Sequence, residues 1–329
     1  MKSEIIVALK KIIENENAEE DDIVRELQNL IYNIEAKNDE YKDAEALSSL
    51  FAKNLDIIKN GKANTGIIYT GYREMDYLLN GFSLGELIVI GGRPGIGKTA
   101  LVLNILLHIS KENPVLYFNL NSSNITLSRR ILSIISSTST ERFNNPMFKD
   151  EFEQKLIEIS PIIGEYKLNF NQHYDQSLNA FKAYCIKEID SKGIKVIVID
   201  HLQLMGINNF KYNRDQEISK VTAFLKKMAS EFNIIIIATS QLSRANENRG
   251  GDKRPHLSDL RESGSIEQIA NKVILVHRPE YYGITETADA ESTRGLMQIF
   301  VAKNDTGNIG ELWLKLRHEN SKIEDWKFL

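Results

Sequence analysis

The sequence has little of several features that would place it in a specialised class of protein. Its 329 residues contain one cysteine, Cys185, which excludes an internal disulfide framework. Cys185 lies in an apolar helical pattern, which predicts a buried core thiol rather than a nucleophile. No apolar run approaches the roughly 18 residues of a membrane span, and the N-terminus has no stretch apolar enough for a signal peptide. We therefore expect a cytoplasmic protein with no membrane contact.

The chain also lacks a strong net charge of either sign. Its 41 Lys/Arg and 45 Asp/Glu give a formal net charge of −4, which is not that of a general nucleic-acid binder. The acidic excess falls in the first 60 residues, which hold 8 Lys/Arg against 14 Asp/Glu. Any contact with nucleic acid must therefore be local. The hydrophobic share of 42% supports a sizeable core, in one large domain with an appendage or in two domains.

The N-terminal part of the chain has apolar residues at helical spacing. This spacing predicts a helical hairpin in the first 36 residues and a second helical stretch over about 43–59. We assign residues 1–40 to a helical appendage, 41–62 to a separate helix and 63–329 to the main domain. The apolar stripe of the helix at 43–59 either packs on its own domain or docks on a neighbouring subunit, and the residues alone leave both possibilities open.

The main domain shows short buried strands that alternate with helices. Strands are predicted at Leu87–Ile90, Val115–Asn119, Tyr166–Phe170, Lys195–Ile199, Ile234–Ala238 and Lys272–Val276. Helical stretches are predicted near 124–138, 150–159, 176–191 and 214–231. This alternation predicts an α/β fold with a mostly parallel sheet that is covered on both faces. Two further strands, Leu296–Val301 and Leu312–Leu316, are expected to form a closing hairpin.

The most specific motif is Gly92-Arg93-Pro94-Gly95-Ile96-Gly97-Lys98-Thr99, which fits the phosphate-loop pattern G-x-x-x-x-G-K-[ST]. It follows a buried strand and opens a helix, which is the context that the motif requires. Backbone N–H groups and the helix N-terminus then cradle the α/β-phosphates, Lys98 reaches the β/γ-phosphates and Thr99 ligates Mg²⁺. The motif therefore predicts that ATP and Mg²⁺ bind here.

Two later strands end in polar side chains that we expect at the same edge of the sheet. The run Lys195–Asp200 is an apolar strand that ends in a carboxylate, the Walker B arrangement, so Asp200 can hold the Mg²⁺ shell opposite Thr99. The next strand along the chain ends in Thr239-Ser240-Gln241. Gln241 either senses the γ-phosphate or is an ordinary polar strand end.

Four segments together resemble the C-terminal motor domain of DnaB-type replicative helicases, members of helicase superfamily 4. They are residues 93–99, 198–205, 239–244 and 259–268. The last is Asp259-Leu260-Arg261-Glu262-Ser263-Gly264-Ser265-Ile266-Glu267-Gln268, and it discriminates best because RecA-fold ATPases in general share only the phosphate loop and the Walker B strand.

The resemblance covers about residues 43–326 and has several implications. It implies a RecA-like P-loop fold, a hexameric ring with ATP sites between subunits, and single-stranded DNA threaded through the centre. It also implies that residues 41–62 form the family's linker helix, which packs on an adjacent subunit. The resemblance therefore favours docking of the apolar stripe at 43–59 on a neighbouring subunit over packing on its own domain.

A locally basic loop over 244–261 is the candidate DNA contact. Its basic residues are Arg244, Arg249, Lys253, Arg254 and Arg261. The loop either follows a phosphate backbone or is a solvated charged segment. The resemblance places Arg261, Glu262 and Gly264 on the DNA-contacting loop. Since the segment lacks aromatic residues for base stacking, DNA binding should be led by the backbone and insensitive to sequence.

Two positions depart from the family pattern at catalytic groups. Asn121 stands where the family has a glutamate that orients and deprotonates the attacking water, and an amide cannot accept that proton at neutral pH. Asp305 stands where the family has an arginine finger, a group typically worth ~10³–10⁵ in rate, whereas the nearby Lys303 is retained. In addition, only about 40 residues precede the linker helix, too few for the family's N-terminal domain. A primase-docking role is therefore not expected.

Two functions are compatible with these residues. The first is an ATP-dependent, ring-forming DNA helicase or translocase that acts on single-stranded DNA in replication. The second is a helicase-like module that binds ATP and DNA but hydrolyses ATP slowly. Either would form a homo-oligomer, and a helicase loader or a homologous helicase subunit is a candidate for a further partner.

Overall fold

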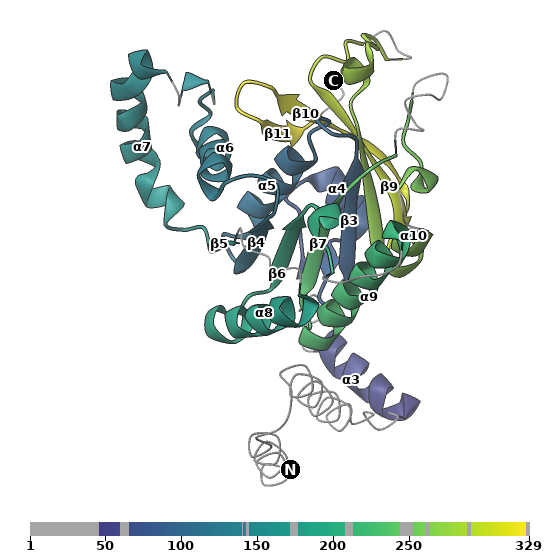
Figure 1. The fold of residues 1–329 in the computed structure, drawn as a ribbon. Coiled ribbons are helices and arrows are strands. Elements are labelled where there is room, and N and C mark those ends of the chain that lie inside the picture. Colours follow the sequence, from purple (N-terminus) through teal and green to yellow (C-terminus); the bar gives the residue numbers. More distant parts are fainter. Residues whose placement is uncertain are drawn as a thin grey trace, which may run out of the picture. The chain divides into compact units, whose positions relative to one another are not determined.

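The computed structural model of the chain describes residues 46–59, 66–139, 141–142, 145–171, 177–207, 213–243, 253–260, 264–287 and 291–326. The chain divides into two units, Met1–Thr65 and Gly66–Leu329, which Figure 1 draws together. In the first unit the described element is helix α3 (Leu47–Lys59), which lies within the helix predicted at 43–59. The predicted N-terminal appendage lies outside the described residues.

The second unit is built on a nine-stranded sheet with the order β11-β10-β9-β8-β3-β7-β6-β4-β5. The strands are β3 (Leu87–Gly92), β4 (Val115–Asn119), β5 (Leu168–Asn171), β6 (Val196–Asp200), β7 (Ile235–Gln241), β8 (Lys272–His277), β9 (Leu296–Asn304), β10 (Gly310–Arg317) and β11 (Lys322–Asp325). Strands β3 to β8 pair in parallel, whereas β9, β10 and β11 pair antiparallel at one side. The predicted α/β fold with a mostly parallel sheet is confirmed.

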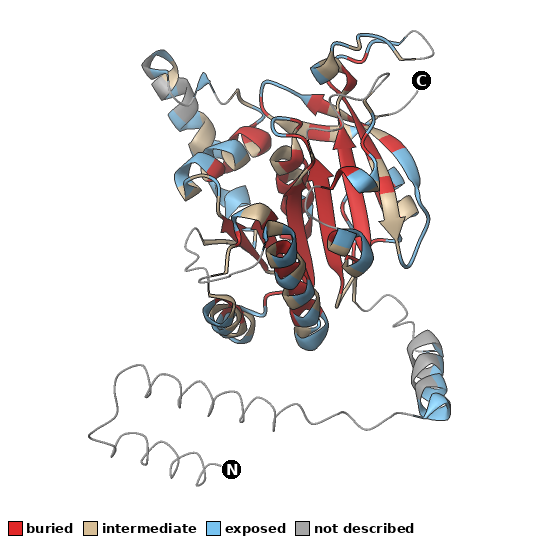
Figure 2. Ribbon diagram, turned by 45° about the vertical axis from the view of Figure 1, so that its right-hand side comes forward, coloured by how far each residue is buried: buried red, intermediate tan, exposed pale blue. Residues whose placement is uncertain are grey.

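Helices cover both faces of this sheet (Figure 1). One face carries α4 (Arg73–Leu79), α5 (Lys98–Ile109) and α6 (Asn124–Ser136), and the other carries α8 (Leu178–Lys192), α9 (Arg214–Phe232) and α10 (Gly264–Ile269). Ile88 and Ile90 of β3 pack toward α5, while Leu87 and Val89 pack toward α9. The parallel strands are therefore buried on both sides, as Figure 2 shows in red. Helix α7 (Lys149–Ile163) lies beside α6.

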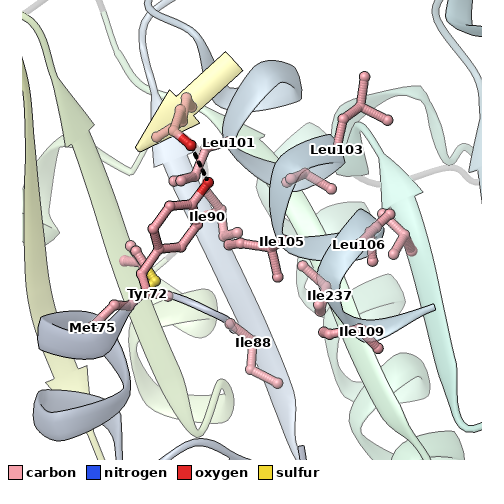
Figure 3. Packing of buried hydrophobic residues seen from close by; sticks show 14 of the residues in the cluster. Tyr72, Met75, Ile88, Ile90, Leu101, Leu103, Ile105, Leu106, Ile109 and Ile237 are labelled. Carbon is pink, nitrogen blue, oxygen red and sulfur yellow. Dashed lines mark hydrogen bonds between the residues drawn. The ribbon is translucent and has the colours of Figure 1, made fainter. Parts of the chain in front are cut away.

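Figure 3 shows the core on the α5 side of the sheet. Leu101 and Ile105 of α5 pack with Ile90 of β3, all fully buried. At the rim of this core the hydroxyl of Tyr72, which directly precedes α4, donates to the carbonyl oxygen of Ile323 in β11 at 3.2 Å and so joins the start of α4 to the edge of the sheet. On the opposite face Cys185 of α8 is fully buried and burial raises the pKa of its thiol, so the predicted core thiol is confirmed.

The structure corrects two details of the predicted strands. Strand β5 begins at Leu168 rather than Tyr166, because the N–H of Tyr166 donates to the carbonyl oxygen of Ile163 and that of Lys167 to the carbonyl oxygen of Ser110, so neither N–H pairs with β4. The predicted closing hairpin is part of a longer antiparallel extension, because β8 also pairs antiparallel with β9 and β11 adds to β10. Within the part of the chain that the structure describes, no helix is long and apolar enough to cross a membrane.

A two-stranded sheet of β1 (Ile67–Ile68) and β2 (Phe82–Ser83) precedes β3, and a buried ion pair joins the start of β3 to the sheet beside it. The ammonium of Lys272 lies 2.9 and 2.8 Å from the two carboxylate oxygens of Glu86 and donates to the Thr306 hydroxyl at 2.7 Å. The Lys272 side chain is 0% exposed and that of Glu86 6%. The turn between β9 and β10 is therefore fastened to the strand that leads into the phosphate loop.

Replacing Lys272 with methionine tests this ion pair. Lys272→Met leaves Glu86 as a buried charge without its partner, so the free energy of unfolding should fall by about 3–5 kcal/mol in urea. The double variant Glu86→Gln, Lys272→Met removes both charges and should recover most of that loss. If the single and double variants are equally unstable, the pair is not what stabilises this corner of the sheet.

Candidate active site

Residues 92–99 connect β3 to α5 through a tight loop. Gly95 and Gly97 have φ values of +76° and +108°, which residues with a Cβ atom rarely adopt. A Cβ atom on Gly97 would also lie 2.7 Å from Cε of Met297. Gly97 then caps α5, where its carbonyl oxygen accepts from the N–H of Leu101 at 2.9 Å. The loop has the form that brings backbone N–H groups and a helix N-terminus to a phosphate group.

The Lys98 side chain is folded onto this loop. Its ammonium donates to the carbonyl oxygens of Gly92 at 2.8 Å and Arg93 at 3.1 Å. Burial lowers the pKa of Lys98 to about 8; the nearby Asp200 carboxylate opposes this shift and the Arg93 guanidinium adds to it. The ammonium is thus a largely buried cation at neutral pH, held by backbone oxygen atoms within reach of the loop.

Asp200 is the centre of a hydrogen-bond network at the end of β6. Its Oδ2 atom accepts from the Thr99 hydroxyl at 2.8 Å and from the Tyr117 hydroxyl at 2.7 Å, and Oδ1 accepts from the Thr239 hydroxyl at 2.6 Å. The donors come from α5, β4 and β7 because the parallel strands end at one edge of the sheet, where α5 also begins. The predicted pair of Thr99 and Asp200 is therefore brought together, in an arrangement suited to Mg²⁺.

Gln241, at the end of β7, lies beside His201. The Gln241 Nε2 and His201 Nε2 atoms are 3.2 Å apart, and the Gln241 N–H donates to Oε1 of Gln203 at 3.2 Å. Burial lowers the pKa of His201 from its usual value; Asp200 opposes this shift and Lys98 adds to it. The neutral imidazole of His201 thus orients the side-chain amide of Gln241, which was predicted at this edge of the sheet.

A pocket of about 690 Å³ opens over these groups. Its described lining includes Pro94, Gly95, Gly97, Lys98, Thr99, Asn121, Asp200, His201, Gln241, Arg129, Arg130, Arg278 and His318. Asp200 is the one carboxylate among these lining residues, whereas four of them are Lys or Arg. This excess of positive charge suits a polyphosphate. Asn121, which the resemblance puts at the position of the family's glutamate, is among the lining residues.

The outer wall of the pocket contains a cluster that the sequence did not reveal. Oε1 of Glu280 lies 2.6 Å from the Arg278 guanidinium and 2.7 Å from Nε2 of His318, and Oε2 accepts from the N–H of Gly295 at 2.9 Å. Burial raises the pKa of Glu280, but the Gly295 N–H and the Arg278 guanidinium outweigh it, so the pKa lies below its usual value. Glu280 therefore holds two basic side chains at the pocket rim.

Lys303, predicted among the catalytic residues, lies away from the described lining of this pocket. Its ammonium donates to the carbonyl oxygens of Gln268 at 3.1 Å and Ala270 at 2.7 Å, at the end of α10, and lies 3.6 Å from Oδ1 of Asp305. Oδ2 of Asp305 in turn accepts from the Asn271 amide at 3.1 Å. The described pocket lining does not include these side chains.

The predicted DNA contacts are described in part. The Lys253 ammonium lies 5.7 Å from the centre of the Tyr282 ring, and Arg254 lies 3.5 Å from Glu311. Gly264 is exposed at the start of α10. The other predicted contacts, Arg244, Arg249, Arg261 and Glu262, lie outside the described residues.

Comparison with known proteins shows the family to which this chain belongs. Residues 67–325 match the family described as "DnaB-like helicase C terminal domain". This chain belongs to that family. It is 36% identical over 295 residues to a probable replicative DNA helicase of Trieres chinensis, covering 87% of this chain and 64% of the relative. It is 33% identical over 297 residues to the replicative DNA helicase DnaB of Mycoplasma genitalium, covering 84% and 63%. The chain thus spans less than two thirds of the length of these curated relatives.

Two solved structures agree with the fold. One, of an ATPase domain, has a TM-score of 0.77 and 27% identity, over 87% of this chain and 100% of that domain. The other is a DnaB-like replicative helicase, described with its interactions with primase, which has a TM-score of 0.75 and 27% identity, over 99% of this chain and 77% of that one. The predicted resemblance to the DnaB-type motor domain is confirmed.

Two glycine-to-alanine substitutions distinguish the effect of the loop's shape on ATP binding from the general effect of backbone strain on stability. Gly97→Ala should weaken binding of a fluorescent ATP analogue by about 10-fold or more, because the φ of +108° becomes strained and Cβ meets Met297. Gly193→Ala, at a φ of +64° with open space around it, should cost about 1 kcal/mol in urea unfolding without changing ATP affinity. Equal ATP affinity in both variants would contradict a role of the loop shape in binding.

Proposed function

We propose that this chain is the motor of an ATP-dependent, ring-forming DNA helicase that moves along single-stranded DNA in replication. One observation carries the proposal. The phosphate loop, Thr99 and Asp200 meet at one edge of the sheet, where the Thr99 hydroxyl lies 2.8 Å from Oδ2 of Asp200, in a chain that belongs to the DnaB-like family. Family relatives named as replicative DNA helicases support the same activity.

In this proposal Gly92–Thr99 bind ATP, and Lys98 exchanges its contacts with Gly92 and Arg93 for the β/γ-phosphates. The residues fit Mg²⁺ because Thr99 offers a hydroxyl lone pair while its proton points at the Asp200 carboxylate. Bound Mg²⁺ neutralises charge that develops on the phosphate oxygens. Gln241, oriented by His201, contacts the γ-phosphate, and Asn121 orients the attacking water.

The remaining assignments follow the family. DNA phosphates contact Arg244, Arg249, Lys253, Arg254 and Arg261, with Glu262 and the N–H of Gly264 on the same loop. Lys303 acts toward the ATP site of a neighbouring subunit in a hexameric ring. Residues 41–62 serve as linker helix between the appendage at 1–40 and the motor at 63–329. The protein works in the cytoplasm, and a helicase loader or homologous helicase subunit is a further partner.

Membership of a helicase family supports a motor rather than a binding module with little turnover. The two departures at Asn121 and Asp305 then affect the rate of hydrolysis and leave the ATP-binding groups intact. Asp200 is the one carboxylate in the described pocket lining, and its oxygens already accept three hydrogen bonds. The group that the site lacks is therefore a carboxylate at position 121 to accept the proton of the attacking water.

ATP hydrolysis measured with and without single-stranded DNA tests the motor. The wild-type chain should hydrolyse ATP faster when DNA is present, and Lys98→Ala should abolish turnover because the β/γ-phosphates lose their cation. Lys155→Ala, at a partly exposed lysine paired with Glu158 on α7, is the matched control and should leave turnover unchanged. Tight ATP binding without turnover, with or without DNA, would overturn the motor in favour of the binding module.

Restoring the family residues tests the account of the rate. Asn121→Glu should raise the single-turnover rate by about 10²-fold, because a carboxylate in the pocket can take the proton from water. Asn121→Gln, which adds length without a carboxylate, should give no gain. Adding Asp305→Arg to Asn121→Glu should raise the rate further only under conditions in which the ring is assembled. If neither glutamate nor arginine increases the rate, another group limits hydrolysis.

A further inference from the structure

Tyr117 is a phenol in the middle of a parallel strand. It lies in β4, is 0% exposed and packs in the apolar core between the sheet and α5, with its ring centre 6.0 Å from that of Phe170. A buried hydroxyl costs free energy unless it has a hydrogen-bond partner. The partner is Oδ2 of Asp200, at 2.7 Å. The core therefore contains a polar group that is directed at the site carboxylate.

The register of the sheet explains how Tyr117 reaches Asp200. In the pairing of β4 with β6, Asn119 lies opposite Asp200 and Tyr117 lies opposite Val198, two residues earlier. The length of the phenol ring spans this offset. The described lining of the pocket does not include Tyr117, so its hydroxyl approaches the carboxylate from the core side, while Thr99 approaches from the loop.

The donors to Asp200 differ in how firmly they are held. Thr99 is in the first turn of α5 and has a second task as a metal ligand in the proposed site. Tyr117 and Thr239 lie in strands that are paired on both sides, are fully buried and contact different oxygens of the carboxylate. A hydrogen bond to an ionised acceptor is among the stronger ones, and two such bonds from rigid strands fix the plane of the carboxylate.

We propose that Tyr117 is a positioning residue for the metal site: its hydroxyl holds the Asp200 carboxylate in the orientation that binds Mg²⁺ together with a nucleotide. The inference rests on the proposed ATP- and Mg²⁺-binding function. Outer-shell partners of metal-binding carboxylates orient these ligands, and losing one typically lowers metal affinity by ~10–100-fold. Tyr117 acts through Asp200, from the core side of the sheet edge.

The test is Tyr117→Phe, which removes the hydroxyl and keeps the ring. Binding of Mn²⁺ to the chain with a non-hydrolysable ATP analogue, followed by electron paramagnetic resonance, should weaken by about 10–100-fold. Affinity for the same analogue in EDTA should not change, because the phosphate loop and Lys98 are untouched. In the Asp200→Asn background, Tyr117→Phe should cause no further loss of Mn²⁺ affinity.

Tyr72→Phe is the matched control, because it removes another buried tyrosine hydroxyl from the same core, one that donates to the Ile323 carbonyl oxygen. It should lower thermal stability about as much as Tyr117→Phe and leave Mn²⁺ binding unchanged. Equal Mn²⁺ affinity in the wild type and Tyr117→Phe, or an equal loss in Tyr72→Phe, overturns the positioning role alone. A wild-type chain that binds the analogue but no Mn²⁺ with it overturns the metal site in the proposed function as well.

Discussion

The carboxylate of Asp200 is the point on which the active-site edge of this sheet depends. Three hydroxyl donors converge on its two oxygens, from the first turn of α5, from β4 and from β7, while β6 supplies the carboxylate itself. The network joins the first turn of α5, next to the phosphate loop, to three neighbouring strands of the sheet. A buried, fully satisfied polar network of this kind specifies one arrangement, because any unpaired member would be costly.

Most of the sheet could be predicted from the sequence because the parallel strands are buried on both faces. Runs such as Val196–Ile199 and Ile235–Ala238 are apolar throughout, and the helices between them have clear periodicity. The antiparallel side was harder to predict. Strand β11 has the residues Lys322–Asp325 with one apolar member, Ile323, so its place depends on pairing with β10 and not on local pattern.

The residues of the candidate site also differ in whether the sequence predicts them. Lys98, Thr99 and Asp200 belong to motifs whose spacing encodes their place at the strand ends, and the structure brings them together. Tyr117 gave no signal, because a tyrosine in a buried strand has the pattern of any core residue and its partner is 83 positions away. The cluster of Arg278, Glu280 and His318 depends on two segments that meet only in the folded chain. Contacts set by tertiary register cannot be inferred from one sequence.

The ion pair of Glu86 and Lys272 has a mechanical consequence. Strand β3 begins next to Glu86, which is joined through Lys272 to Thr306, and ends at Gly92, where the phosphate loop starts. Its six residues span roughly 20 Å and are hydrogen-bonded on both sides, to β7 and β8. A strand held in this way resists stretching and bending. A displacement of the turn between β9 and β10 would therefore be transmitted through β3 to the phosphate loop, because β3 itself deforms little.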